Sequence, residues 1–450
     1  MNQGAVLTIA RSVCAKAVCW QPEREDMGLS NKTGFRRTLV SVAIALCLCA
    51  CAGRPEGVLI PVEATAPGTS VVDMIVATTR ARSSGPDLFS GERGATSSYS
   101  QISVSIPPDT ARKVGEVQWP QRVPGNPATD FVTLRTDEMT AEQARSWFDQ
   151  RVVKVPKHRV LVFIHGFNNR FDDAVFRFAQ IAHDSGGDFV PVLFTWPSRG
   201  NVLAYGYDRE SASYSRDGLE RLLTFLAKSP KVGEISILAH SMGNWVAMET
   251  LRQMAIRNGH VFPKIKNVML AAPDVDVDIF RTQLEDLGSP HPNLTVFVSQ
   301  DDHALQVSRR VWGSAARLGQ VDPEAEPYRS EFQANKITVF DLTKLRTGGA
   351  LNHGKFAESP EVVQMIGSRL AQGQVMTDDR AGVGDRIIEV TAGAASSIGT
   401  AAGVVISAPV AVFDPVTRNN LGAQVDHLGR SVTGTAESTS GLITEPLQGR

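Results

Sequence analysis

The chain has 450 residues, of which 42% are hydrophobic and 21% charged, with 46 Lys and Arg against 47 Asp and Glu. This composition is typical of a soluble globular protein and excludes a wholly disordered chain, a collagen and a polytopic membrane protein. The formal net charge of -1 gives the chain no general attraction to polyanions, so we expect no nucleic-acid partner.

The first 50 residues are predicted to be a signal region, with Met27 as the true start. Lys32, Arg36 and Arg37 precede an uncharged run over residues 39–52, which is too short to span a bilayer as a helix. The segment Leu48 to Cys51 resembles a bacterial lipobox, which implies lipidation of Cys51 and cleavage before it. Acyl chains would then hold the protein on a membrane of the bacterial cell envelope.

Residues 51–70 are rich in Pro, Gly and Thr and predict a lipidated tether, and residues 71–372 predict the folded domain. Residues 373–450 form a low-complexity tail rich in Ala, Gly, Ser and Thr, in which nothing suggests chemistry. All five cysteines lie within the first 51 residues, so the folded domain has neither a disulfide nor a thiolate metal site. The sequence carries no signal for an oligomeric state.

The domain begins with short extended patterns and continues with strands that alternate with helices. The first patterns predict an antiparallel leading edge over residues 71–78, 101–106 and 131–134. Apolar strands are predicted at 160–165, 189–196, 234–240, 267–273, 294–299 and 336–342, and helices at 171–185, 212–228, 243–258, 276–287, 305–316 and 360–372. Such alternation predicts an α/β fold with a mostly parallel twisted sheet and helices on both faces.

A nucleophilic serine is predicted at Ser241, where a core strand runs directly into an amphipathic helix. Small residues at positions -2 and +2, here Ala239 and Gly243, allow the sharp turn that exposes a serine oxygen. A serine hydroxyl needs a base, and the base needs a carboxylate to orient it. His353 follows the last predicted strand and precedes the closing helix, so we predict it as the base.

Three aspartates compete for the acid. Asp302 is favoured because it follows the strand before the last, beside the loop that carries His353, and Asp274 and Asp301 remain alternatives. The run of alternating aspartates from Asp274 to Asp278 is not a calcium loop, because Ile279 stands where that loop needs glycine.

The oxyanion of the reaction needs N–H donors, and we predict the backbone of Met242 as one of them. Residues His165 to Asn169 resemble the HG-type oxyanion loop of lipases and esterases, which implies Phe167 N–H as the second donor, with Gly166 giving the substrate access. Phe167 and Trp196 are predicted to line the substrate pocket. Residues 349–355 have the spacing of a phosphate loop, but Phe356 replaces the Ser or Thr that would hold magnesium.

Taken together, the motifs resemble a bacterial α/β-hydrolase family that is esterase- or lipase-like and of unassigned function. They are ATTRAR, IPP, HGFNN, FTWPSRG, YDRESA, AHSMGN, LAAPDVD and SQDDHAL, followed by the late His353, and the resemblance covers about residues 71–370. It implies the α/β-hydrolase fold and places the acid at Asp302. The family usually has an aromatic or small pair after its histidine, whereas this chain has Gly354, Lys355 and Phe356.

The sequence therefore predicts a serine hydrolase, foremost a carboxylic ester hydrolase, that forms an acyl-enzyme on Ser241 without a cofactor or metal. Its partner would be a small ester or other acyl substrate. Thioesterase or amidase activity uses the same residues and remains open. A different alternative is a non-catalytic envelope lipoprotein that uses the same fold as a binding scaffold.

Overall fold

The computed structural model describes residues 55–311 and 315–372. The predicted signal region, the lipidation site Cys51 and the tail over residues 373–450 lie outside these ranges. Within them, no helix is long and apolar enough to cross a membrane.

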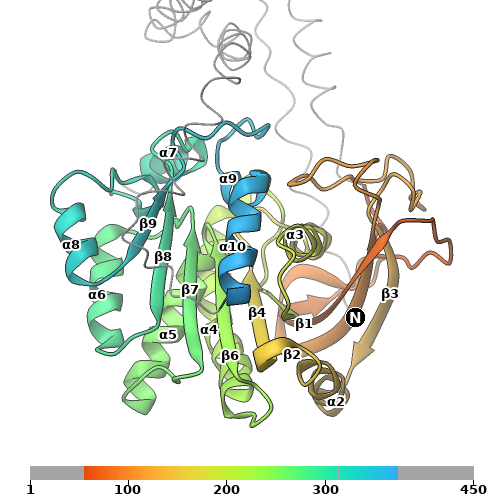
Figure 1. The fold of residues 1–450 in the computed structure, drawn as a ribbon, viewed down its shortest axis with the longest axis horizontal. Helices are drawn as coiled ribbons and strands as arrows, with labels where there is room; N and C mark the ends of the chain where they lie inside the picture. Colours follow the sequence, from red (N-terminus) through yellow and green to blue (C-terminus); the bar gives the residue numbers. More distant parts are fainter. Residues whose placement is uncertain (1–54, 312–314, 373–450) are drawn as a thin grey trace, which may run out of the picture. The chain divides into compact units, whose positions relative to one another are not determined.

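A nine-stranded sheet runs through the described part of the chain, in the order β3-β2-β1-β5-β4-β6-β7-β8-β9 (Figure 1). Its strands are β1 (Ser70–Arg82), β2 (Phe89–Ile106), β3 (Val132–Met139), β4 (Arg159–Ile164), β5 (Val190–Thr195), β6 (Glu234–His240), β7 (Ile265–Ala271), β8 (Asn293–Val298) and β9 (Thr338–Asp341). All neighbours from β1 to β9 pair in parallel, while β2 pairs antiparallel with β1 and with β3. The predicted mostly parallel sheet with an antiparallel edge is confirmed, although β1 also joins the parallel part through β5.

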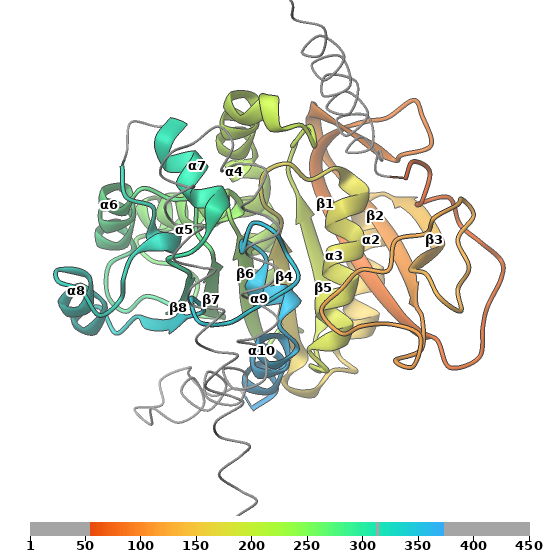
Figure 2. The same cartoon turned by 90° about the horizontal axis from the view of Figure 1, so that it is seen from above.

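Helices cover both faces of the sheet, as the view from above shows (Figure 2). They are α2 (Ala141–Val152), α3 (Phe171–Asp184), α4 (Tyr205–Lys228), α5 (Gly243–Asn258), α6 (Val277–Leu287), α7 (His303–Val311), α8 (Tyr328–Ala334), α9 (Lys355–Glu358) and α10 (Pro360–Gln372). Three short 3-10 turns, η1 (Pro156–His158), η2 (Val202–Ala204) and η3 (Leu318–Gln320), lie in the connections.

The alternation of side chains along each strand divides the core into two apolar layers. In β4, Val160, Val162 and Ile164 point into the layer shared with α2, α4, α5, α6 and α8. Leu161 and Phe163 point into the opposite layer, with α3, α9 and α10. A strand buried on both faces has to be apolar at every position, which is why these strands are continuous hydrophobic runs.

The predicted tether is wrong for the part that the structure describes. Val58 and Leu59 are buried in the layer that includes α3. The Thr133 hydroxyl donates to Val58 O at 2.9 Å, and Val62 N–H donates to Thr133 O at 2.9 Å. The folded unit therefore begins before residue 71, because the apolar side chains of Val58 and Leu59 pack in the core.

Replacing Leu59 by Ala should distinguish a packed segment from a free linker. The side chain is 1% exposed, so we expect Leu59→Ala to lower the free energy of unfolding by about 2 to 4 kcal/mol. Ile60 is 51% exposed and provides the control, because Ile60→Ala should cost less than about 1 kcal/mol. The measurement is urea unfolding, and equal midpoints for the two variants would contradict the packing.

Candidate active site

Ser241 occupies a strained turn between β6 and α5. Its φ is 53°, a left-handed conformation that residues with side chains rarely adopt. Hydrogen bonds hold the turn: Ser241 N–H donates to Ala271 O at 2.9 Å. Its carbonyl accepts from Asn244 N–H at 3.1 Å and from Asp274 N–H at 3.2 Å. The end of β7, the loop after it and the start of α5 thus hold the serine backbone in a sharp strand-to-helix turn.

Two glycines give this turn the space that it needs. A Cβ at Gly243 would lie 2.4 Å from His165 O, so the helix start passes directly against the end of β4. A Cβ at Gly166 would lie 2.8 Å from the Cβ of Ser241. The loop after β4 therefore touches the serine, and Ala239, at position -2, fits as a fully buried residue.

His353 and Asp302 form the closest histidine–carboxylate pair of this region. The distance from His353 Nδ1 to Asp302 Oδ2 is 2.6 Å, and Asp302 is completely buried. The other carboxylate oxygen of Asp302 accepts from Leu305 N–H at 3.0 Å, at the start of α7. These contacts hold both oxygens of the Asp302 carboxylate. The contact with Asp302 uses Nδ1 of His353 and not its other ring nitrogen, Nε2.

The two alternative aspartates have other partners. Asp274 accepts from the hydroxyls of Tyr205 at 2.6 Å and Ser308 at 2.7 Å, and Arg317 Nε lies 3.4 Å from its Oδ1. Asp301 forms an ion pair with Lys355, at 2.7 Å. Both carboxylates thus contact groups other than the imidazole that the sequence predicts as the base.

His240 connects the serine turn to His353. It directly precedes Ser241, and the centre of its ring lies 4.8 Å from the centre of the His353 ring. The distance from its Nε2 to His353 O is 3.2 Å. Burial, and then the nearby charge of His353, hold the pKa of His240 well below its ordinary value, which favours the neutral ring.

The loop after β4 is held from behind by His165 and Trp196. Trp196 N–H donates to Nε2 of His165 at 3.2 Å, and its indole N–H donates to His165 O at 2.8 Å. The Nδ1 of His165 lies 2.8 Å from Gly166 O. Burial, and then the nearby Arg80, lower the pKa of His165 to about 3, so it acts as a neutral structural group.

Trp196 and Phe167 were both predicted to line a substrate pocket, but they differ in burial. Trp196 is fully buried and stacks on His165 with ring centres 5.0 Å apart. Its burial leaves it no surface for a substrate in this conformation. Phe167 is half-buried and meets Tyr205 edge-on at 4.9 Å, so it remains the better candidate for a pocket wall.

Arg80, on β1, is a buried cation that the sequence analysis missed. Its guanidinium donates to Ser198 O at 2.8 Å and to Asn169 O at 2.9 Å. It therefore joins the loop after β4 to the loop after β5. Burial lowers its pKa to about 10, and Asp208 is the foremost carboxylate that opposes this shift. Arg80 lies in the motif ATTRAR over residues 77–82, which was the available sequence signal.

The electrostatics of His353 follow from its neighbours. Burial opposes its positive charge, but the attraction and hydrogen bond of Asp302, with smaller contributions from Asp274 and Glu358, raise the pKa of His353 above its ordinary value. In the described ranges, no group of three or more His, Cys, Asp or Glu is placed to hold a metal ion.

The sequence profile of the family described as alpha/beta hydrolase of unknown function (DUF900) matches residues 140–369, just over half of the chain. The chain belongs to this family. It has the α/β-hydrolase fold. The match begins further along the chain than the resemblance noted above, which started near residue 71.

Other similarities are more distant. An uncharacterized protein of Nostoc sp. strain PCC 7120, alr1448, is 24% identical over 152 residues, which cover 28% of this chain and 39% of that protein. This chain thus spans well under half the length of that relative. Fungal esterases from Rhizomucor miehei match at a TM-score of 0.31 and 12% identity, over 74% of this chain and 90% of theirs.

The thioesterase RedJ of Streptomyces coelicolor matches at a TM-score of 0.27 and 16% identity, over 52% of this chain and 96% of its own. TM-scores of this size carry no conclusion about activity. The assignment of the chain to the family and to the α/β-hydrolase fold depends on the family match and the strand order.

The pairing of His353 with Asp302 predicts a measurable titration. Because the pKa of His353 is raised, its imidazole should titrate above about pH 6.5 in the folded protein. This pair stabilises the fold below that pH, and the stabilisation is lost as the pH rises through the folded-state pKa. Asp302→Asn should lower the pKa, as followed by NMR of the imidazole protons. Asp322→Asn, at an exposed position, is the control and should leave the titration unchanged.

Proposed function

We propose that the protein is a serine hydrolase that cleaves carboxylic esters through an acyl-enzyme on Ser241. The observation that carries the proposal is the coincidence of two features at one edge of the sheet. One is a serine held at a left-handed φ of 53° between β6 and α5. The other is a histidine 2.6 Å from a buried carboxylate, packed on the residue that precedes this serine.

In the first half of the reaction, Ser241 Oγ attacks the substrate carbonyl carbon while His353 Nε2 takes the hydroxyl proton. The imidazolium that forms keeps its Nδ1–H on Asp302, which stabilises the charge without taking the proton. The bond to the leaving alcohol then breaks, and His353 returns the proton to the alcohol oxygen. The acyl group remains on Ser241.

In the second half, His353 takes a proton from a water molecule, and the resulting oxygen attacks the acyl carbon. Collapse of the intermediate releases the acid and restores the Ser241 hydroxyl. Each tetrahedral intermediate carries an oxyanion, for which we propose the N–H groups of Met242 and Phe167 as donors. Each such donor contributes about 3 kcal/mol to transition-state stabilisation in enzymes of this kind.

A fluorophosphonate probe tests the nucleophile without knowledge of the substrate. The wild type should be labelled, and Ser241→Ala should not be labelled, because the phosphonate bonds to the serine oxygen. Hydrolysis of a short p-nitrophenyl ester should fall by about 10³-fold or more in the same variant.

A neighbouring serine provides the matched control. Ser236 lies on the same strand, and Ser236→Ala should be labelled like the wild type. Equal labelling of wild type and Ser241→Ala, or no labelling of either, would favour the non-catalytic scaffold. Comparison of matched ester, thioester and amide substrates then separates the three hydrolase activities.

We also propose that the protein is exported and anchored in the cell envelope by acyl chains on Cys51. The support is the sequence from Lys32 to Cys51. Cys51→Ser should move the protein from the membrane fraction to the soluble fraction, whereas Cys49→Ser should leave it on the membrane. Membrane retention of the Cys51 variant would contradict this proposal.

A further inference from the structure

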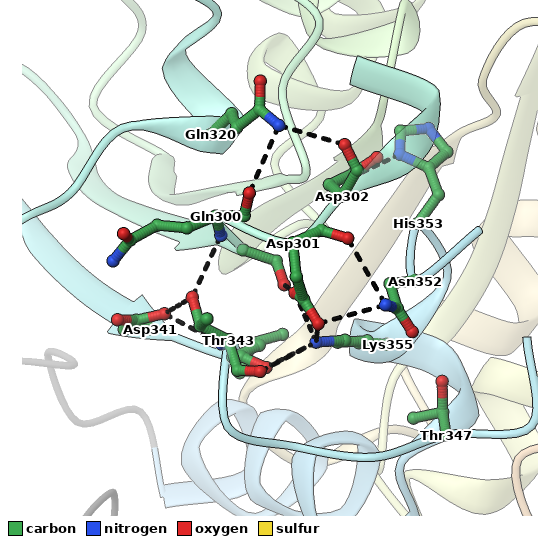
Figure 3. A network of polar contacts seen from close by, with 12 residues as sticks. Gln300, Asp301, Asp302, Gln320, Asp341, Thr343, Thr347, Asn352, His353 and Lys355 are labelled. Atoms are coloured by element: carbon green, nitrogen blue, oxygen red, sulfur yellow. Dashed lines mark hydrogen bonds and ion pairs between the residues drawn. The ribbon is translucent and has the colours of Figure 1, made fainter. Parts of the chain in front are cut away.

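A buried lysine lies two residues beyond the proposed catalytic histidine. Lys355 is 2% exposed, and its Nζ donates to both carboxylate oxygens of Asp301, at 2.7 and 3.0 Å (Figure 3). It also donates to Leu342 O at 3.0 Å and to Thr343 O at 3.2 Å. A lysine is rarely buried to this extent unless its charge is paired, and here each of these contacts is to an oxygen within 3.2 Å.

Asp301 is held by the histidine loop from a second side. Asn352 Nδ2 donates to Asp301 Oδ2 at 3.0 Å and to the backbone O of Asp301 at 3.3 Å. The Ser299 hydroxyl donates to Asp301 Oδ1 at 2.5 Å. The residue before His353 and the residue two beyond it thus both bind one carboxylate.

The loop after β8 and the segment that carries His353 contact each other through two adjacent aspartates. Asp301 and Asp302 are adjacent after β8, and Lys355 and His353 contact them in turn, one carboxylate each (Figure 3). His303 N–H adds a backbone bond to Leu351 O at 3.0 Å. Between the end of β9 at Asp341 and the start of α9 at Lys355, the chain has no regular element to hold it.

We propose that Lys355 and Asp301 are a positioning pair that fixes His353 on Asp302 and prevents the neighbouring carboxylate from competing for the imidazole. The proposal rests on the proposed function, in which His353 is the base. Neither member of the pair touches the reacting atoms, so their effect is on the placement of the imidazole. A displacement of about 1 Å at a catalytic group costs on the order of 100-fold in rate.

The pair also sets the charge balance near the imidazole. The charges of Asp302 and Asp274, from the loops after β8 and β7, and of Glu358, from α9, act on the His353 imidazole, which also packs against His240 from β6. Lys355 and Asp301 add one charge of each sign. Removing the lysine leaves an extra carboxylate, which favours the imidazolium, whereas removing the carboxylate leaves an extra cation, which disfavours it.

The test is a double-mutant cycle of Lys355→Met, Asp301→Asn and the combined variant. The readout is the second-order rate constant of labelling by the fluorophosphonate probe as a function of pH. Both single variants should label at least about 10-fold more slowly than the wild type. The apparent pKa of labelling should rise by about half a unit in Lys355→Met and fall by about as much in Asp301→Asn. In the combined variant it should return to the wild-type value while labelling stays slow.

Lys344→Met is the matched control, because Lys344 lies in the same loop but is exposed, and it should label like the wild type. A purely structural role would slow labelling in all three variants without opposite shifts of the pKa, and that result would overturn the proposal. If the single variants do not fold, the combined variant decides, because it buries no unpaired charge. Labelling of the combined variant at the wild-type rate would overturn the proposal that the pair positions His353. Absence of labelling in the wild type would instead overturn the serine-hydrolase proposal, and this inference with it.

Discussion

The left-handed turn at Ser241 is the constraint on which the site depends. A residue with a Cβ stays at a φ of 53° only where its surroundings hold it there. Those surroundings are Ala271 at the end of β7 and Asp274 in the loop after it, which bond the N–H and the carbonyl of Ser241, and the two glycines that leave room for the turn. Parallel strands make this possible, because the carboxyl ends of β4, β6 and β7 meet at one edge of the sheet. The serine oxygen is therefore placed by backbone geometry, before any side chain acts on it.

Charged residues in this protein support the site from behind. Arg80 joins the loops after β4 and β5, Asp274 joins the serine turn to Tyr205 and to Ser308 on α7, and Lys355 joins the histidine loop to Asp301. Each of these groups is buried or nearly so, and each contacts backbone oxygens or an opposite charge, as a buried charge must. Buried charges of this kind contribute little net stability, but removing one partner strongly lowers the free energy of unfolding. They therefore restrict each loop to one arrangement. This suits a site built on loops, whose backbones have few other contacts to fix them.

Much of this architecture was predictable from the sequence, because the apolar strands are buried on both faces and read as continuous hydrophobic runs. The bounds of α5 and α10 match the predicted residues 243–258 and 360–372, and the sheet class is confirmed. The helix α2 was missed although its buried residues Ala144, Trp147, Phe148 and Val152 have helical spacing, and α8 was missed because it is short. The burial of Val58 and Leu59 was missed because Pro and Gly around them suggested a linker. The role of Arg80 was missed because its partners are backbone oxygens far away in the chain, and spacing alone does not reveal such contacts.

The three candidate aspartates show why spacing alone could rank but not decide the acid. Asp274 lies in the loop after β7, and its N–H donates to Ser241 O, so its backbone supports the serine turn. Its carboxylate accepts two hydroxyl hydrogen bonds and pairs with Arg317, and it acts on the His353 imidazole through its charge. Asp301 and Asp302 both follow β8, the strand beside β9. They are adjacent in the chain, and their side chains have different partners. Lys355 Nζ contacts the carboxylate of Asp301 and His353 Nδ1 contacts that of Asp302, so the two adjacent carboxylates have different partners on the loop after β9.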